Sequence, residues 1–145
     1  MDTNLHKELE LIQSIINRMA NNSFLIKGWT ITLISLLLAV GKDSITSDKG
    51  FFYLIIVLVV LIPFWWLDAF YLKQERFFRA VYNRAVNLRN EEGYVPFCMK
   101  DRNDIIKKEI DKLSSPMFSH STFWFYFPLI LLILLGLILK MMGKL

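Results

Sequence analysis

The residues best suited to bind a ligand lie between 73 and 90, in a stretch without proline or glycine. At about 100° per residue, a helix there would carry its apolar and polar side chains on opposite faces. We call the polar set the basic arc: Lys73, Arg76, Arg79, Asn83, Arg84 and Asn87, with Asn90 at its end. Guanidinium and amide groups suit phosphates and base edges, so the arc predicts a nucleotide or oligonucleotide ligand. Contact with anionic lipid headgroups, or a plain topology signal, is the alternative.

Two charges, Lys27 and Asp68, interrupt otherwise apolar stretches. Each lies roughly one helical turn inside its stretch, so in an antiparallel hairpin they would sit at similar depth. An unpaired charge inside a membrane costs about 3 kcal/mol, which favours an ion pair within the chain or between subunits. The alternative is that Lys27 reaches the headgroups while Asp68 caps local polar groups.

Small and hydroxylated residues recur along the first apolar stretch at spacings of four, three and four: Gly28, Thr32, Ser35 and Ala39. We call this set the small-residue stripe. The spacing places it on one helix face. Such a face permits close helix packing, and in an oligomer it could instead line a water-filled path.

No catalytic or metal-binding constellation is evident. The two histidines, His6 and His120, are far apart, and the single Cys98 excludes an intrachain disulfide. No phosphate loop, nucleophile elbow or dinucleotide fingerprint occurs, and His, Cys and Asp show no metal-ligand spacing. We therefore expect no enzyme activity, no metal and no cofactor.

The elements that must position these residues are membrane spans. Hydrophobic residues make up 54% of the 145, and they gather in three blocks, 24–40, 51–72 and 123–139. This segregation predicts an all-α integral membrane protein with three transmembrane helices. A soluble core containing the short first block is the alternative. Gly41–Gly50 reads as a turn, so the first two spans should form a hairpin over 24–72.

The distribution of lysine and arginine predicts the orientation. Ten lie in 73–121 and only two in each of the other three flanking segments. By the positive-inside rule, 1–23 and 73–121 face the cytoplasm of a bacterial inner membrane, and the tail of 122–145 faces outward.

Cytoplasmic helices are expected to complete the fold. In 1–23, apolar residues at heptad spacing (Leu5, Leu9, Ile12, Ile16 and Met19) form a seam that could pack subunits together, pack on the chain's own helices or lie on the membrane. The helix over 73–90 should continue the second span, and a further amphipathic helix is expected near Arg102–Leu113.

Two stretches carry a family resemblance: NRMANNSFLIKGWT from Asn17 to Thr30 and FWWLDAFYLKQERFFRAVY from Phe64 to Tyr82. They resemble small bacterial membrane effectors of anti-phage defence, such as those of Hailong-type systems, over about the first ninety residues. The resemblance implies an oligomeric ion channel gated by an oligonucleotide that a nucleotidyltransferase-like partner makes. It would place the oligonucleotide on Lys73, Arg76, Arg79 and Arg84.

These observations support two functions. The first is a homo-oligomeric channel, taken as a tetramer, that depolarises the membrane under control of a cytoplasmic nucleotide or oligonucleotide. The second is a non-conducting membrane adaptor that recruits a soluble partner through its cytoplasmic helices. A chain with three spans cannot enclose a pore alone, so the channel requires oligomerisation.

Overall fold

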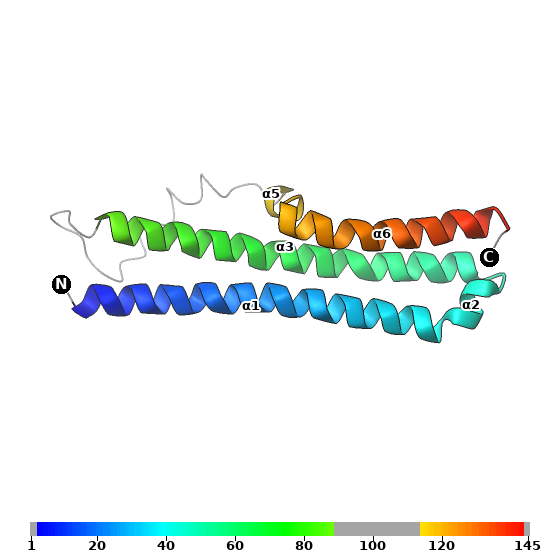
Figure 1. Cartoon of the computed structure of the whole chain (residues 1–145), viewed down its shortest axis with the longest axis horizontal. Coiled ribbons are helices and arrows are strands. Elements are labelled where there is room, and N and C mark those ends of the chain that lie inside the picture. The colour runs from blue at the N-terminus through cyan, green and yellow to red at the C-terminus, as the bar shows by residue number, and fades with distance from the viewer. Residues whose placement is uncertain (1–2, 89–113, 144–145) are drawn as a thin grey trace.

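The computed structural model describes residues 3–88 and 114–143, and every regular element within them is helical. Helix α1 spans Thr3–Val40 and helix α3 spans Gly50–Leu88. The two lie side by side and antiparallel over their whole length, joined at one end by the short helix α2 (Lys42–Thr46) (Figure 1). Helix α5 (Ser114–Met117) leads into α6 (His120–Met141), which packs along the first half of α3.

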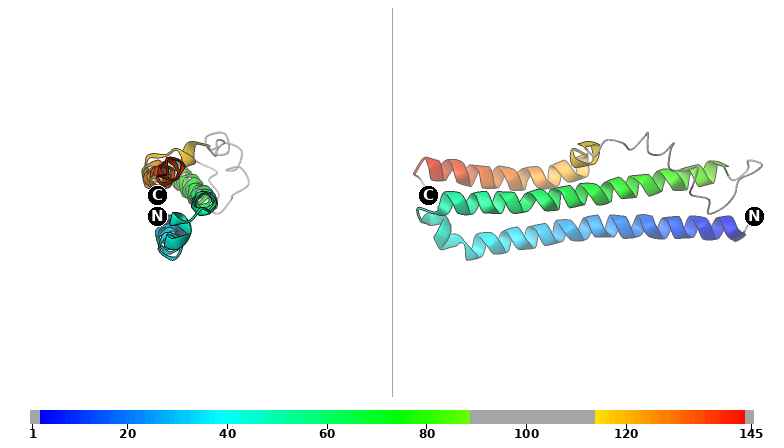
Figure 2. Two further views of the ribbon diagram at one scale, coloured as in Figure 1. Left: turned by 90° about the vertical axis from the view of Figure 1, so that its right-hand side faces the viewer. Right: turned by 180° about the vertical axis from the view of Figure 1, so that it is seen from behind.

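The described chain contains three helices long and apolar enough to cross a membrane, one each in α1, α3 and α6. The α6 helix covers only one end of the long hairpin, and the other end of the α1–α3 pair projects beyond it (Figures 1 and 2). We call the three-helix part the bundle: residues 23–71 with α2, α5 and α6. We call the projecting part the stalk: residues 6–22 of α1 with 72–88 of α3.

Both long helices are continuous along their length. The described part of the amphipathic segment, from Thr3, and the span 24–40 lie on one helix of 38 residues. No proline interrupts them, and a helix of this length measures about 57 Å at 1.5 Å per residue. Span two continues into the basic arc as predicted, and α3 runs without a break through Pro63 to Leu88. The helix expected near Arg102–Leu113 lies outside the described residues.

The connection between the first two spans is tighter than a simple turn. It contains α2, and a side chain at Gly41 would overlap the ring of Tyr53. The Tyr53 hydroxyl donates a hydrogen bond to the carbonyl of Leu37, and Lys140 of α6 donates to the carbonyl of Thr46 at 3.2 Å. These contacts fasten the ends of all three spans together far from the stalk.

Two separate apolar cores hold the helices together. The bundle core brings together seven buried residues from all three spans: Ile34, Leu54, Val57, Leu61, Tyr126, Ile133 and Leu137. The stalk core is smaller and consists of Ile12, Ile16 and Val81, with Phe77, Phe78, Ala80 and Tyr82 packed around them. The heptad seam of α1 therefore packs on the chain's own α3, which is one of the three alternatives that the sequence left open.

Candidate functional site

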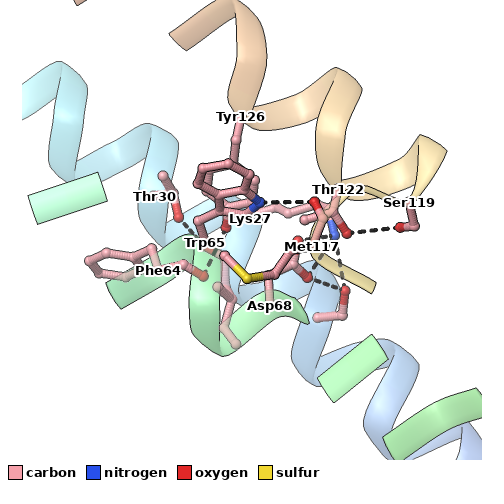
Figure 3. A network of polar contacts seen from close by, with 11 residues as sticks. Lys27, Thr30, Phe64, Trp65, Asp68, Met117, Ser119, Thr122 and Tyr126 are labelled. Atoms are coloured by element: carbon pink, nitrogen blue, oxygen red, sulfur yellow. Dashed lines mark hydrogen bonds and ion pairs between the residues drawn. The ribbon is translucent and has the colours of Figure 1, made fainter. Parts of the chain in front are cut away.

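The most distinctive polar site lies where the stalk meets the bundle, and we call it the junction (Figure 3). Its centre is an ion pair in which Lys27 Nζ lies 2.7 Å from Asp68 Oδ2 and donates a hydrogen bond to Oδ1, also at 2.7 Å. The Asp68 side chain is fully buried, whereas 18% of the Lys27 side chain is exposed. The structure thus brings together the two charges that the sequence placed at equal depth, and it does so within one chain.

Ser23 completes the ion pair, and the sequence reasoning missed it. Its hydroxyl donates to Asp68 Oδ1 and accepts a hydrogen bond of 3.0 Å from Lys27 Nζ. Ser23 lies four residues before Lys27, so both project from the same face of α1. That spacing was the signal that could have identified it. Within residues 3–88 and 114–143, Asp68 Oδ2 accepts no hydrogen bond beyond its contact with Lys27.

Helices α5 and α6 are attached to α3 beside the ion pair. The Trp65 indole donates a hydrogen bond to the carbonyl of Met117 at 3.1 Å, and the Tyr126 hydroxyl donates to the carbonyl of Phe64 at 3.1 Å. The two rings stack with their centroids 6.1 Å apart. Tyr126 is fully buried, as is Thr30 of α1. All three spans therefore meet at the junction, as Figure 3 shows.

The contact at the centre of the junction is electrostatic, between one lysine and one aspartate. The titratable side chains that the described residues bring close to Asp68 are Lys27 and the buried phenol of Tyr126. Among the described residues no group of three His, Cys, Asp or Glu side chains could hold a metal ion. His120 lies against Trp124, with ring centroids 6.0 Å apart, and Cys98 falls outside the described residues. The contacts of the junction connect the stalk to the three spans.

The small-residue stripe lies on the outer face of the first span. Gly28, Thr32, Ser35 and Ala39 are all exposed, whereas the buried residues of this span, such as Thr30 and Ile34, face α3 and α6. The Thr32 hydroxyl donates to the carbonyl of Gly28 at 3.0 Å, and a side chain at Gly28 would meet no atom within 4 Å. The stripe therefore takes no part in packing within the chain.

The basic arc divides into exposed and half-buried members. Arg76, Arg79, Asn83 and Asn87 are exposed on the stalk, whereas Lys73 and Arg84 are half-buried. Arg79 forms an ion pair of 2.7 Å with Glu75, one turn earlier. The spacing of four residues between Glu75 and Arg79 could have predicted this ion pair. Because Arg79 is paired, Arg76 is the exposed arginine that is more available to a ligand. Asn90 lies outside the described residues.

Comparison of the chain with protein-family models, with curated proteins and with solved structures finds no match. The resemblance to membrane effectors of anti-phage defence therefore rests on the two sequence stretches alone. Those stretches contain the principal side chains of the junction, since Ser23 and Lys27 fall in the first and Trp65 and Asp68 in the second.

Proposed function

We propose that this protein is the subunit of a homo-oligomeric ion channel in the bacterial inner membrane, controlled by a nucleotide or oligonucleotide that binds its stalk. The observation that carries the proposal is the exposure of the small-residue stripe on the outer face of the first span. Hydroxyl and small side chains gain little from contact with lipid tails. They are well suited to line a narrow aqueous path between several copies.

A path through a single chain is excluded by the packing of the bundle. Its interior is filled by the apolar core, where Val57, Leu61 and Ile133 are each no more than 2% exposed. An ion could not shed its water there without severe cost. Conduction therefore requires several copies, with the stripe of each copy turned toward a shared axis.

Control by a ligand is supported by the continuity of α3. Arg76 and Asn83 lie on the exposed face of the stalk, and Asp68 lies at the junction on the same unbroken helix. The eight residues from Asp68 to Arg76 correspond to about 12 Å of helix at 1.5 Å per residue. A phosphate group bound to the stalk would thus act on the spans through one rigid element and the junction. Membrane depolarisation in defence against phages follows as the role that the family resemblance implies.

The proposal is tested by ion flux through liposomes that contain the purified full-length protein, with and without short oligonucleotides. We expect flux that the oligonucleotide alters, and we expect Arg76→Gln to weaken that response while Lys7→Gln, an exposed lysine far along the stalk, leaves it unchanged. Ser35→Leu should reduce flux, whereas Leu36→Ile, a conservative change at the neighbouring exposed position, should not. Absence of flux from folded, oligomeric protein would contradict the channel and favour the adaptor.

A further inference from the structure

An open groove runs between α1 and α3 beside the junction. Its cavity volume is about 200 Å³, and it is lined by Asn22, Leu25, Ile26 and Trp29 of α1 and by Leu67 and Tyr71 of α3. Ile26 is 9% exposed, whereas Trp29 is 68% exposed and Leu25 47%. The groove is therefore shallow and open, with Ile26 at its base and with Leu25 and Trp29 facing outward from the chain.

The groove lies on the side of the hairpin away from α6. Lys27 Nζ lies 5.9 Å from the centre of the Phe125 ring of α6. Residues two positions apart on a helix point to nearly opposite sides, so Leu25 and Trp29 point away from that helix. The groove is accordingly not covered by α6.

Polarity changes along the groove in the same direction on both helices. On α1, Asn22 is the last residue of the stalk and Trp29 lies deepest in the span. Helix α3 runs the opposite way, as Figure 1 shows. On α3, Tyr71 therefore lies nearest the stalk and Leu67 lies deeper. A phospholipid has the same order along the membrane normal, from polar headgroup and ester carbonyls to acyl chains. Tryptophan and tyrosine are also the residues typical of the boundary between these zones.

A positive charge continues this series toward the stalk. Arg18 lies four residues before Asn22, so it projects from the same face of α1 as Asn22, Leu25 and Trp29. Its side chain is exposed, and no acidic side chain among the described residues forms an ion pair with it. Arg18 is thus placed where the phosphate of a lipid in the groove would lie.

We infer that this groove binds one anionic phospholipid from the leaflet on the stalk side of the membrane. Arg18 pairs with the headgroup, the Asn22 amide and the Tyr71 hydroxyl hydrogen-bond the ester region, and an acyl chain lies along Leu25, Trp29 and Leu67. The inference does not depend on conduction, because it rests on the lining of the groove and on Arg18 and not on a water-filled path; the groove adjoins the small-residue stripe on α1, since Leu25 and Thr32 are seven residues apart.

Native mass spectrometry of the full-length protein in detergent tests the site directly, with phosphatidylglycerol and phosphatidylcholine as probes. We expect phosphatidylglycerol to be retained more tightly. Arg18→Gln should weaken its binding about fivefold, because one basic group near an anionic lipid surface contributes roughly that much. The same variant should weaken phosphatidylcholine less, because the choline group of that lipid offsets the charge of its phosphate. Lys7→Gln, which removes an exposed cation about 16 Å farther along α1, should change neither lipid.

A second variant examines the ester region separately from the charge. Tyr71→Phe keeps the ring and removes only the hydroxyl, so it should weaken both lipids about threefold, as expected for one hydrogen bond in a membrane. Equal affinity of the unaltered protein for the two lipids would overturn the inference, as would an Arg18→Gln protein that behaves like Lys7→Gln. Retention of no lipid at all would also overturn it.

Discussion

The bundle and the stalk share the helices α1 and α3, yet different forces hold the two regions together. In the stalk, apolar residues such as Ile12, Ile16 and Val81 meet between helices whose outer faces are polar. The hydrophobic effect drives that contact in water. In the bundle, leucine and isoleucine cover the outside as well as the inside, with Leu131, Leu132 and Leu135 more than half exposed.

Lipid tails are as apolar as these side chains, so burial alone gives the spans little reason to associate. What distinguishes the inside of the bundle is close packing together with the polar contacts of the junction and of the α2 connection between the first two spans. Polar contacts therefore determine how the helices of the bundle associate, whereas apolar contacts determine how the helices of the stalk associate. Substitutions of the two kinds should therefore have opposite consequences in the two regions.

The largest effect is expected from Asp68→Ala. It leaves Lys27 without its buried partner, and removal of one member of a buried ion pair costs about 3 to 5 kcal/mol. Unfolding by SDS in mixed micelles would measure the loss. The Arg79–Glu75 pair of the stalk provides the control, because its Arg79 side chain is 61% exposed and Glu75→Ala should cost only about 0.5 to 1 kcal/mol.

A double replacement sharpens this prediction. Lys27→Met combined with Asp68→Leu removes both charges and keeps the volume, so it should cost clearly less than Asp68→Ala alone. If the single and double variants lost the same amount of unfolding free energy, the ion pair would not be what stabilises the junction.

Ile16→Ala should have the next largest effect, and it should act on the stalk. Ile16 is 4% exposed, and truncating a buried isoleucine to alanine costs about 2 to 4 kcal/mol. Hydrogen exchange should show faster exchange of the stalk amides and unchanged protection in the bundle. Leu11→Ala, at an exposed apolar position of the same helix, is the matched control and should alter neither region. Equal loss of protection in both regions would show that they unfold as one unit.

Gly41→Ala should lower the free energy of unfolding by about 1 to 3 kcal/mol, because the added methyl group overlaps the Tyr53 ring and must displace it. Gly41 lies in the connection between α1 and α2. Gly28→Ala is the matched control, because its methyl group meets no atom within 4 Å. In a helix that change should stabilise the isolated chain by about 0.5 to 1 kcal/mol. SDS unfolding of both variants tests the pair, and destabilisation of the monomer by Gly28→Ala would contradict the exposed position of the stripe.

The smallest effect is expected from Tyr126→Phe, which removes the hydroxyl that donates to the carbonyl of Phe64 and that also interacts with the Thr30 side chain. Hydrogen bonds between membrane helices contribute about 0.6 kcal/mol on average. The same unfolding assay should resolve a loss of this size. A loss above about 2 kcal/mol would show that the junction acts as one cooperative network rather than as separate contacts.

The spans and the pairing of Lys27 with Asp68 could be reached from the sequence, because a charge in an apolar stretch has few partners. The roles of Trp65 and Tyr126 could not. An aromatic residue near the end of a span fits the membrane boundary as well as a helix contact, and the choice depends on how each helix is rotated. Packing against neighbouring helices sets that rotation, and a single sequence does not encode it locally. For the same reason the sequence could not decide whether the stripe faces inward or outward.

The central claim is that the outer face of the first span borders water in the assembled protein, and cysteine accessibility tests it most directly. Cys98 is the single cysteine, so a Cys98→Ser background permits Ser35→Cys and Leu36→Cys to be compared in liposomes. We predict that a charged, membrane-impermeant thiol reagent modifies the cysteine at 35 and blocks flux, while the cysteine at 36 stays unmodified. Modification of neither position, in oligomeric protein, would contradict the claim.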